Sequence, residues 1–279
     1  MLNHHRAEYR SFVAHYSEEN LARQRDTEIL EAAKLIKRDI LRTLPDVLVF
    51  RSLLVQRSLV RILTIFTIRH PSNSYAQGMN DVLAPLFWVF LAEGLGVSPG
   101  QLAADPSPLD GPADPAWILA PEADAYHCFA LFISLIKANY VNGFEGVSAA
   151  IGRLARLVAL CDPELAAHLQ QNQIELLHFA FRWIFCLLLR ELPLTLAIKL
   201  IDCYLVADQP LGELCVYFSL ALLLRFSVKI KSLQREEIII YLQNLPTAGW
   251  GEGDVRLLAS EAYLLRLKMH AALSSSESI

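Results

Sequence analysis

The stretch ILEAAKLIKRDILRTLP (residues 29–45) sets the pattern that the rest of the chain repeats. Its apolar side chains recur at i, i+4, i+7 and i+11 with charged residues between them, which places one apolar stripe along a helix. The stripe consists of Ile29, Ala33, Ile36 and Ile40. Pro45 disfavours helical backbone at the residue before it. The stretch therefore predicts an amphipathic helix that ends ahead of Pro45.

The same periodicity continues on both sides of this stretch. A second stripe runs from Val55 to Phe66, and Arg69 and His70 follow it before Pro71, which suits the carbonyl end of a helix. Further helical periodicity occupies residues 125–142, 150–161, 163–172, 175–189, 195–206, 212–226, 234–243 and 253–272. No stretch alternates with a period of two between turn signals. We therefore expect an all-α protein.

Residues 94–123 interrupt the helical pattern. They hold six of the thirteen prolines and neither Lys nor Arg. This composition predicts a long Pro-rich loop, interpreted as an insertion.

Composition excludes several classes of protein. The 279 residues are 54% hydrophobic and 19% charged with a net charge of -4, which excludes general disorder and allows a large core. The negative charge argues against nucleic acid as a partner. The apolar stretches Ile174–Leu189 and Leu214–Leu224 are broken by charges or too short, so we expect no transmembrane segment and a soluble protein. No apolar region typical of a secretory signal begins the sequence.

Cysteine and histidine spacing suggests no metal site. The five cysteines form no C-x-x-C pair and are expected to be reduced, buried thiols of a cytosolic protein. The eight histidines lack H-x-x-x-H and H-E-x-x-H spacing, and the adjacent His4 and His5 are interpreted as a tail. Gly94-Leu95-Gly96 stands alone and does not predict a phosphate-binding loop.

Two short segments carry a more specific combination, IKRDILRT (residues 36–43) and YAQGMN (residues 75–80). Taken alone, the first is a helix end in which Asp39 and Arg42 form a solvated pair worth about 0.2–0.5 kcal/mol. The second alone is a polar turn in which Gly78 gives backbone freedom before a helix capped by Asn80 or Asp81.

Together and in this order, the segments resemble the I-x-x-D-x-x-R and Y-x-Q-G motifs of the TBC domain, a family of GTPase-activating proteins for Rab-type small GTPases. Three further segments are similar to the family: Arg69-His70-Pro71, residues 181–183 with 190–194, and residues 242–247 with Trp250. The resemblance extends from about Arg23 to Leu267. The family's N-terminal R-x-x-W element has no clean copy, and Arg10-Ser11-Phe12 is the nearest candidate.

The resemblance implies an all-α fold of two helical subdomains that form a V, with the GTPase docking on the groove. Residues 1–145 would form the N-terminal subdomain, which carries both short motifs and the Pro-rich loop. Residues 146–279 would form the C-terminal subdomain.

The resemblance also implies roles for individual residues. Arg42 would be an arginine finger and Gln77 a glutamine finger that replaces the GTPase's own. Asp39 would orient Arg42 or contact nearby backbone, while Tyr75, Gly78 and Asn80 would shape the loop that presents Gln77. These residue types suit the task, because arginine binds phosphate oxygens through a planar fork and a carboxamide can contact phosphate and water at once.

The implied activity is that of a cytoplasmic catalytic activator rather than a stand-alone hydrolase. Its partner would be a GTP-bound Rab-type GTPase, which would carry the GTP and Mg²⁺, so that this chain needs no cofactor or metal of its own. Recruitment to membranes through that partner is left open. The alternative is a non-catalytic Rab-binding effector or scaffold with the same fold.

Charge along the chain is uneven near these motifs. Residues 47–80 contain four arginines and no acid. They are Arg51, Arg57, Arg61 and Arg69. One interpretation is solvated helix faces, and the other is that the arginines steer an acidic GTPase surface, which would make association dependent on salt.

Overall fold

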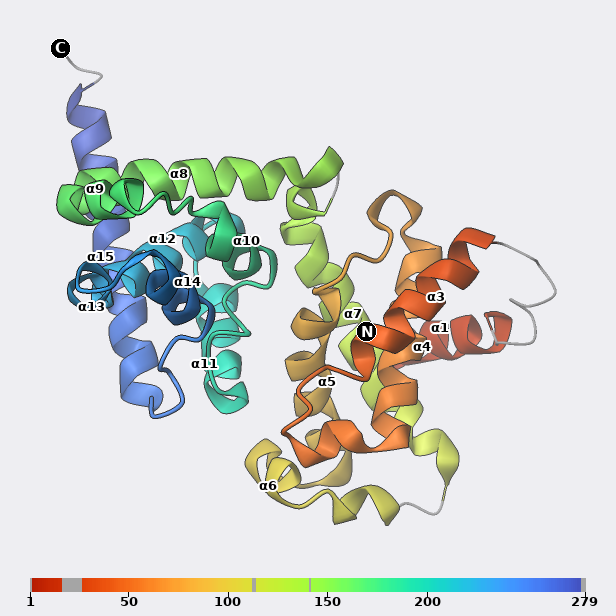
Figure 1. Ribbon diagram of the computed structural model, residues 1–279. Helices are drawn as coiled ribbons and strands as arrows, with labels where there is room; N and C mark the ends of the chain where they lie inside the picture. Colours follow the sequence, from red (N-terminus) through yellow and green to blue (C-terminus); the bar gives the residue numbers. More distant parts are fainter. Residues whose placement is uncertain (1, 17–26, 112–113, 141, 277–279) are drawn as a thin grey trace. The chain divides into compact units, whose positions relative to one another are not determined.

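The structure is a computed structural model that describes residues 2–16, 27–111, 114–140 and 142–276 (Figure 1). Every regular element within these residues is a helix, and no strand is found among them, so the all-α prediction is confirmed. Arg23, where the family resemblance begins, lies outside the described residues.

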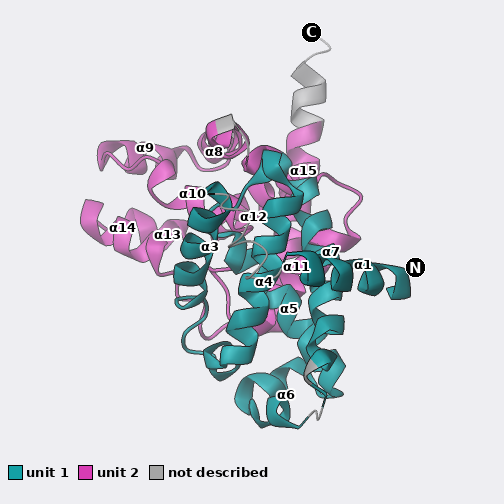
Figure 2. Cartoon of the chain, turned by 90° about the vertical axis from the view of Figure 1, so that its right-hand side faces the viewer, with its two compact units in different colours: residues 1–137 teal, residues 138–279 magenta. Residues whose placement is uncertain are grey.

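The chain divides into two compact units, residues 1–137 and residues 138–279 (Figure 2). The division precedes the boundary expected after residue 145. The reason lies in contacts of the intervening segment with the second unit: the hydroxyl of Tyr140 donates to the carbonyl of Phe185 at 2.9 Å, and Gly146 lies against the backbone of Ala138.

Unit 1 is built from long helices around an aromatic core. They are α1 (Leu2–His15), α3 (Thr27–Ile40), α4 (Leu53–Arg69), α5 (Met79–Leu95) and α7 (Leu119–Leu135). Helices α5 and α7 pack side by side, α3 packs on α4, and α1 packs on α7. The stripe predicted for α3 turns inward, with Ile36 and Ile40 fully buried.

Residues 94–123, expected to be a loop, are largely helical in their described part. Helix α6 (Pro99–Ala104) and the short 3-10 helices η3 (Ser107–Asp110) and η4 (Pro115–Ile118) follow α5, and α7 already begins at Leu119. Pro99 and Pro115 stand at the first position of their helices, where the missing N–H has no intrahelical partner to lose. The prolines therefore start helices here rather than prevent them.

Unit 2 contains eight described α-helices, with α12 (Leu211–Arg225) at its centre. Helix α12 packs on α8, α10, α11 and α15 and is buried along most of its length. The other helices are α8 (Glu145–Cys161), α9 (Pro163–Gln171), α10 (Leu177–Phe185), α11 (Leu194–Val206), α13 (Ser227–Lys231), α14 (Arg235–Gln243) and α15 (Glu252–Ser276).

Helix α10 ends at Phe185, earlier than the predicted end at Leu189. Leu187 and Leu188 adopt positive φ angles of 54° and 60°, which break the helix. Tertiary contacts hold this turn, since the hydroxyl of Tyr204 donates to the carbonyl of Leu187 at 3.2 Å. An apolar run gives no signal for such a turn.

Arg182, a charged residue within an apolar stretch, pairs with the carboxylate of Glu191. Two guanidinium nitrogens donate to the Glu191 carboxylate at 2.7 Å each, and a third contact reaches the carbonyl of Gln243 at 2.9 Å. Thr247 donates its hydroxyl to the carbonyl of Glu191. The two family-like segments of unit 2 therefore meet around Arg182 and Glu191.

All five cysteines are free thiols. Cys186 and Cys215 are buried, as expected, and burial raises the pKa of the Cys215 thiol to about 12. Cys128 on α7 is exposed, which differs from the expectation of buried thiols.

Residues 116–135 are long and apolar enough to cross a membrane by length and composition. Neither of the two apolar stretches considered in the sequence, Ile174–Leu189 and Leu214–Leu224, overlaps it. It is mostly α7, 56% of its most apolar part is buried within the protein, and it carries the charged residues Glu122 and Asp124 in ion pairs. These features are those of a core helix.

The centre of unit 1 is held by the carboxylate of Glu122, whose side chain is fully buried on α7. Arg61 of α4 donates to both carboxylate oxygens, at 2.8 and 2.6 Å, and Tyr9 of α1 donates its hydroxyl at 3.0 Å. Burial, and then the neighbouring carboxylate, raise the pKa of Tyr9, so this hydroxyl stays protonated. One side chain thus joins three helices.

Replacing Glu122 by Gln should lower the free energy of unfolding by about 2–3 kcal/mol, because it leaves the Arg61 charge without a counter-ion in a largely buried place. Urea denaturation of the full chain measures the change. Glu31→Gln is the matched control, since Glu31 pairs with Lys34 in an exposed position and should change stability by less than about 0.5 kcal/mol. Equal effects of the two substitutions would contradict the central role of Glu122.

Candidate functional site

The first motif lies where α3 ends. The backbone leaves the α-helix after Ile40 through tighter turns, in which the N–H of Arg42 donates to the carbonyl of Asp39 at 3.1 Å. Leu44 has a φ of 45°, a left-handed conformation at a helix end that places Pro45 beyond the turn. Arg42 therefore sits on a turn at the carboxyl end of α3, with its side chain 58% exposed.

The second motif leads into α5. Gly78 precedes the helix with a φ of 113°, a conformation that strongly favours glycine. The helix therefore starts at Met79, one residue before the predicted caps Asn80 and Asp81. Asn80 instead accepts the N–H of Gly78 on its Oδ1 atom at 3.0 Å, which holds the turn next to Gln77.

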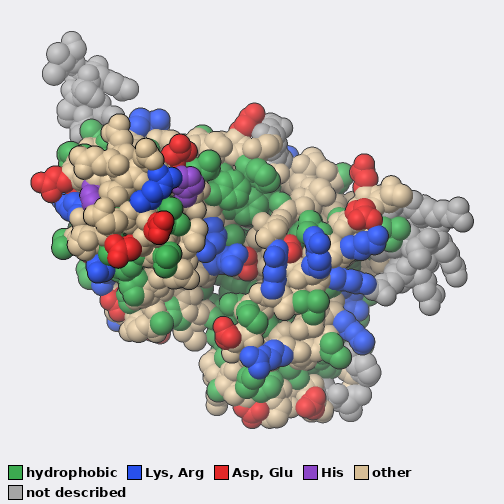
Figure 3. All heavy atoms as spheres, in the orientation of Figure 1, with side chains coloured by type: hydrophobic (Ala, Val, Ile, Leu, Met, Phe, Trp, Pro, Cys, Tyr) green, Lys and Arg blue, Asp and Glu red, His purple; other side chains and the backbone are tan. Residues whose placement is uncertain are grey.

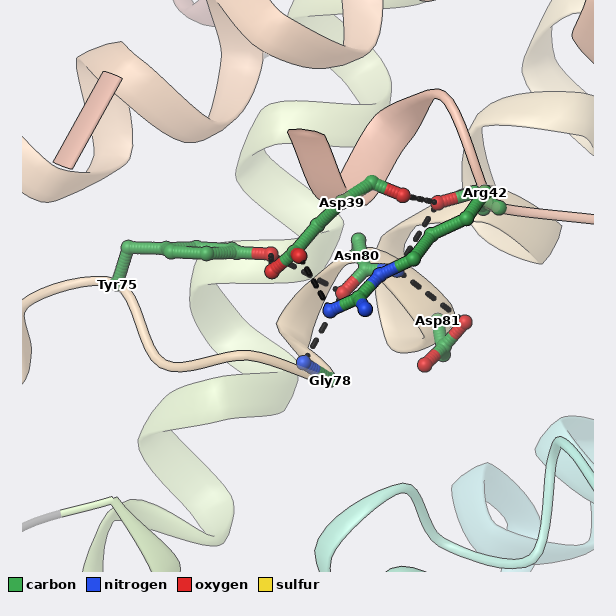
Figure 4. A network of polar contacts seen from close by, with 7 residues as sticks. Asp39, Arg42, Tyr75, Gly78, Asn80 and Asp81 are labelled. Atoms are coloured by element: carbon green, nitrogen blue, oxygen red, sulfur yellow. Dashed lines mark hydrogen bonds and ion pairs between the residues drawn. The ribbon is translucent and has the colours of Figure 1, made fainter. Parts of the chain in front are cut away.

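The buried carboxylate of Asp39 joins the two motifs (Figure 4). Only 1% of Asp39 is exposed. Its Oδ1 atom accepts from Nη2 of Arg42 at 2.6 Å, and its Oδ2 atom accepts from the hydroxyl of Tyr75 at 2.7 Å. Because these are charge-assisted contacts on both oxygens, the carboxylate holds the Arg42 guanidinium and the start of the Gln77 turn together.

Asn80 and Thr43 form a second link between the same segments. The amide of Asn80 donates to Oγ1 of Thr43 at 2.9 Å, and the Thr43 hydroxyl donates to the carbonyl of Asp39 at 2.8 Å. Sequence reasoning gave Thr43 no role, although it lies inside the first motif. A hydroxyl directly after the helix end was the available signal.

Burial and the hydrogen bond to Asp39 raise the pKa of Tyr75 well above its ordinary value. The phenol therefore stays protonated at physiological pH and always offers a donor to the carboxylate. The hydroxyl of Tyr75 lies 2.7 Å from Oδ2 of Asp39 and 3.1 Å from Oδ1 of Asn80, so the contact with Asp39 is the shorter one. The cluster thus keeps one arrangement of donors and acceptors.

All six predicted site residues lie in unit 1, and five of them meet in this cluster. These five are Asp39, Arg42, Tyr75, Gly78 and Asn80. Gln77 is exposed on the turn directly before Gly78, and none of the hydrogen bonds found in the described residues uses its carboxamide. Arg42 and Gln77 are therefore two accessible side chains carried by one buried polar network.

The four arginines of residues 47–80 differ in their surroundings. Arg61 is paired with Glu122, and the guanidinium of Arg69 lies 4.6 Å from the ring centre of Phe12, so neither is a simple solvated charge. Arg51 donates through Nε to the carbonyl of Pro45 at 2.7 Å, and Arg57 is exposed. Of these four arginines, Arg51 and Arg57 are therefore the ones that can steer an acidic GTPase surface.

More basic residues accompany the site on α3. Figure 3 shows Lys and Arg side chains gathered over this helix, where Lys34, Lys37 and Arg38 are all exposed. The exposed face around Arg42 is therefore basic, although the chain as a whole has a net charge of -4. Such a face favours an acidic partner.

The site residues do not form a metal centre. In the part of the chain that the structure describes, one group of three or more His, Cys, Asp and Glu side chains is close enough to share a metal ion, and it consists of His5, Glu8 and His127. None of the six site residues belongs to it.

Comparison with known proteins gives matches over most of the chain. The model of the Rab-GTPase-TBC domain family matches residues 2–231. The protein "GTPase-activating protein gyp1" of Schizosaccharomyces pombe is 35% identical over 228 residues, which are 81% of this chain and 43% of that protein. "TBC1 domain family member 22A" of Homo sapiens is 34% identical over 262 residues, 93% of this chain and 48% of that protein.

A solved structure is similar over both units. The crystal structure of the Ypt/Rab-GAP domain of Gyp1p has a TM-score of 0.86 and 34% identity, and the match covers 96% of this chain and 81% of that one. The chain spans about half the length of the curated relatives that it matches.

Replacing Tyr75 by Phe should lower the free energy of unfolding by about 1–3 kcal/mol, because it removes one donor from a buried carboxylate. Tyr263→Phe is the matched control, since Tyr263 is 54% exposed and makes no comparable contact. Chemical denaturation followed by circular dichroism measures both variants. A Tyr75→Phe variant as stable as Tyr263→Phe would show that the network does not hold the two motifs.

Proposed function

Because the chain belongs to the Rab-GTPase-TBC domain family, we propose that it accelerates GTP hydrolysis by a GTP-bound Rab-type small GTPase. The observation that carries the proposal is the pair Arg42 and Gln77, two accessible side chains on one buried network. The activity is ascribed to residues within this chain, which is shorter than its relatives.

Arg42 acts as the arginine finger in this proposal. Negative charge on the transferring phosphoryl group grows on its equatorial oxygens, and a guanidinium can neutralise it through two N–H donors. Asp39 accepts from Nη2 at 2.6 Å, which holds one edge of the guanidinium and leaves the other N–H donors of the exposed fork for phosphate. Asp39 is thus a positioning residue, as is Tyr75 behind it.

Gln77 supplies the carboxamide that orients the attacking water. Its N–H₂ group can donate to a phosphate oxygen while its carbonyl accepts from water, which is the work of the glutamine in many GTPases. The turn that carries it is held on both sides, by Tyr75 through Asp39 and by Asn80 through Gly78. A fixed turn reduces the entropy lost when the amide engages its target.

The roles of the GTPase and of this chain follow from the chemistry of the reaction. The partner brings GTP and Mg²⁺, and this chain contributes two side chains and a docking surface, without a cofactor of its own. A Rab-type partner would place the chain in the cytoplasm, at the membrane that carries the partner.

Arg42→Ala should reduce the accelerated rate by about 10³–10⁵, and Gln77→Ala by about 10²–10³, because each removes a group that acts only in the transition state. Single-turnover hydrolysis by a panel of GTP-loaded Rab-type GTPases at saturating chain concentration measures both. Arg256→Ala is the control, since Arg256 is 76% exposed on α15, and it should keep the full rate.

Two outcomes would contradict the proposal. If a GTPase binds and its hydrolysis is not accelerated, the chain is a non-catalytic effector or scaffold. If hydrolysis is accelerated and neither substitution slows it, other residues carry the reaction.

Association with the GTPase should slow as salt rises, because the exposed face around Arg42 is basic and steering is screened over about 10 Å at 0.1 M salt. Arg57→Ala should lower the association rate constant by about two- to fivefold at low salt with little change at high salt. Stopped-flow binding measures this effect, with Arg256→Ala as control. A rate constant that is the same at low and high salt would exclude steering.

A further inference from the structure

Three side chains able to bind a metal converge between α1 and α7 of unit 1. His5 and Glu8 stand three residues apart on α1, which puts them on one face of that helix. His127 faces them from α7. One ligand atom from each lies within 4.8 Å of the others.

The two helices are also joined by contacts next to this group. Arg6 donates to the carboxylate of Asp124 through Nε and Nη2, at 3.0 and 2.5 Å, and Tyr9 donates to Glu122 at 3.0 Å. On α1, Arg6 and Tyr9 alternate with His5 and Glu8, and on α7 Glu122 and Asp124 both precede His127. The ligand positions are therefore set by independent interactions rather than by their own attraction.

One ring nitrogen of the group lacks a partner. The Nδ1 atom of His5 is buried, and no hydrogen bond reaches it within the described structure. A buried polar atom without a partner is destabilising, and a metal ion would satisfy it. The rings of His5 and His127 lie with their centres 4.4 Å apart and their planes tilted by 50°.

The distances between the candidate ligand atoms are close to those that a zinc site needs. The Nε2 atom of His127 lies 3.8 Å from Oε2 of Glu8 and 3.2 Å from the carbonyl of His5. Tetrahedral zinc at about 2.0–2.2 Å from each ligand needs ligand atoms about 3.4 Å apart. Rotation of the side chains that moves the ligand atoms by about 1 Å would bring all three to zinc-binding distance. Nε2 of His127 would then contact the metal instead of the carbonyl of His5.

We propose that His5, Glu8 and His127 bind one Zn²⁺ ion, with water in the fourth position. Two imidazoles and a carboxylate suit zinc, whereas Ca²⁺ and Mg²⁺ prefer sets made of oxygen alone. The ion would clamp α1 to α7, because its ligands come from both helices. None of the three residues touches Arg42 or Gln77, so the proposal does not depend on the activity proposed above.

Zinc titration of the chelator-treated full chain by isothermal titration calorimetry tests the site. One Zn²⁺ should bind per chain, and His127→Gln and Glu8→Gln should each weaken binding at least tenfold. Two matched controls should bind as the unmodified chain does. They are His4→Gln, an exposed histidine beside the site, and Cys128→Ser, an exposed thiol next to His127.

Two further measurements identify the site and its effect. Co²⁺ in place of zinc should give tetrahedral d–d absorption without a thiolate charge-transfer band. Zinc at about a hundredfold excess over its Kd should raise Tm by about 5–10 °C, and this rise should be absent in His127→Gln.

Circular dichroism of the metal-free variants establishes that they are folded. Absence of stoichiometric zinc binding would overturn the proposal, as would binding that survives both His127→Gln and Glu8→Gln. Binding that is lost in His4→Gln or Cys128→Ser would also overturn it.

Discussion

The arrangement of the candidate site depends on one buried charge, the carboxylate of Asp39. A carboxylate removed from water must be paired and hydrogen-bonded, and here each oxygen takes a strong donor, from Arg42 and from Tyr75. These donors come from segments that are distant in the sequence, so satisfying the charge brings the end of α3 and the start of α5 together. As a consequence, the exposed side chains of Arg42 and Gln77 are held by the same buried hydrogen-bond network.

Two other buried carboxylates also link separate segments of the chain. Glu122 joins α1, α4 and α7, and Glu191 binds Arg182 and lies beside the segment that carries Thr247. Apolar packing alone tolerates small sliding of one helix on another, whereas a two-pronged arginine–carboxylate pair fits one register.

Sequence reasoning predicted what depends on local pattern. The stripes gave the helices α3 and α4, and the two motifs gave a family whose model matches the chain. It failed where a distant partner decides the outcome. The end of α10 depends on Tyr204, and the tasks of Arg61 and Arg69 depend on Glu122 and Phe12. Likewise, motif spacing within one helix could not reveal that His5 and Glu8 of α1 lie close to His127 of α7.

The central claim is that the water-orienting carboxamide comes from this chain and not from the GTPase. The most direct test uses a Rab-type GTPase whose own water-positioning glutamine is replaced by alanine. Our account predicts that the unmodified chain still accelerates GTP hydrolysis by this variant at close to the usual rate, and that Gln77→Ala abolishes the acceleration. Loss of acceleration with the unmodified chain, while binding persists, would contradict the account.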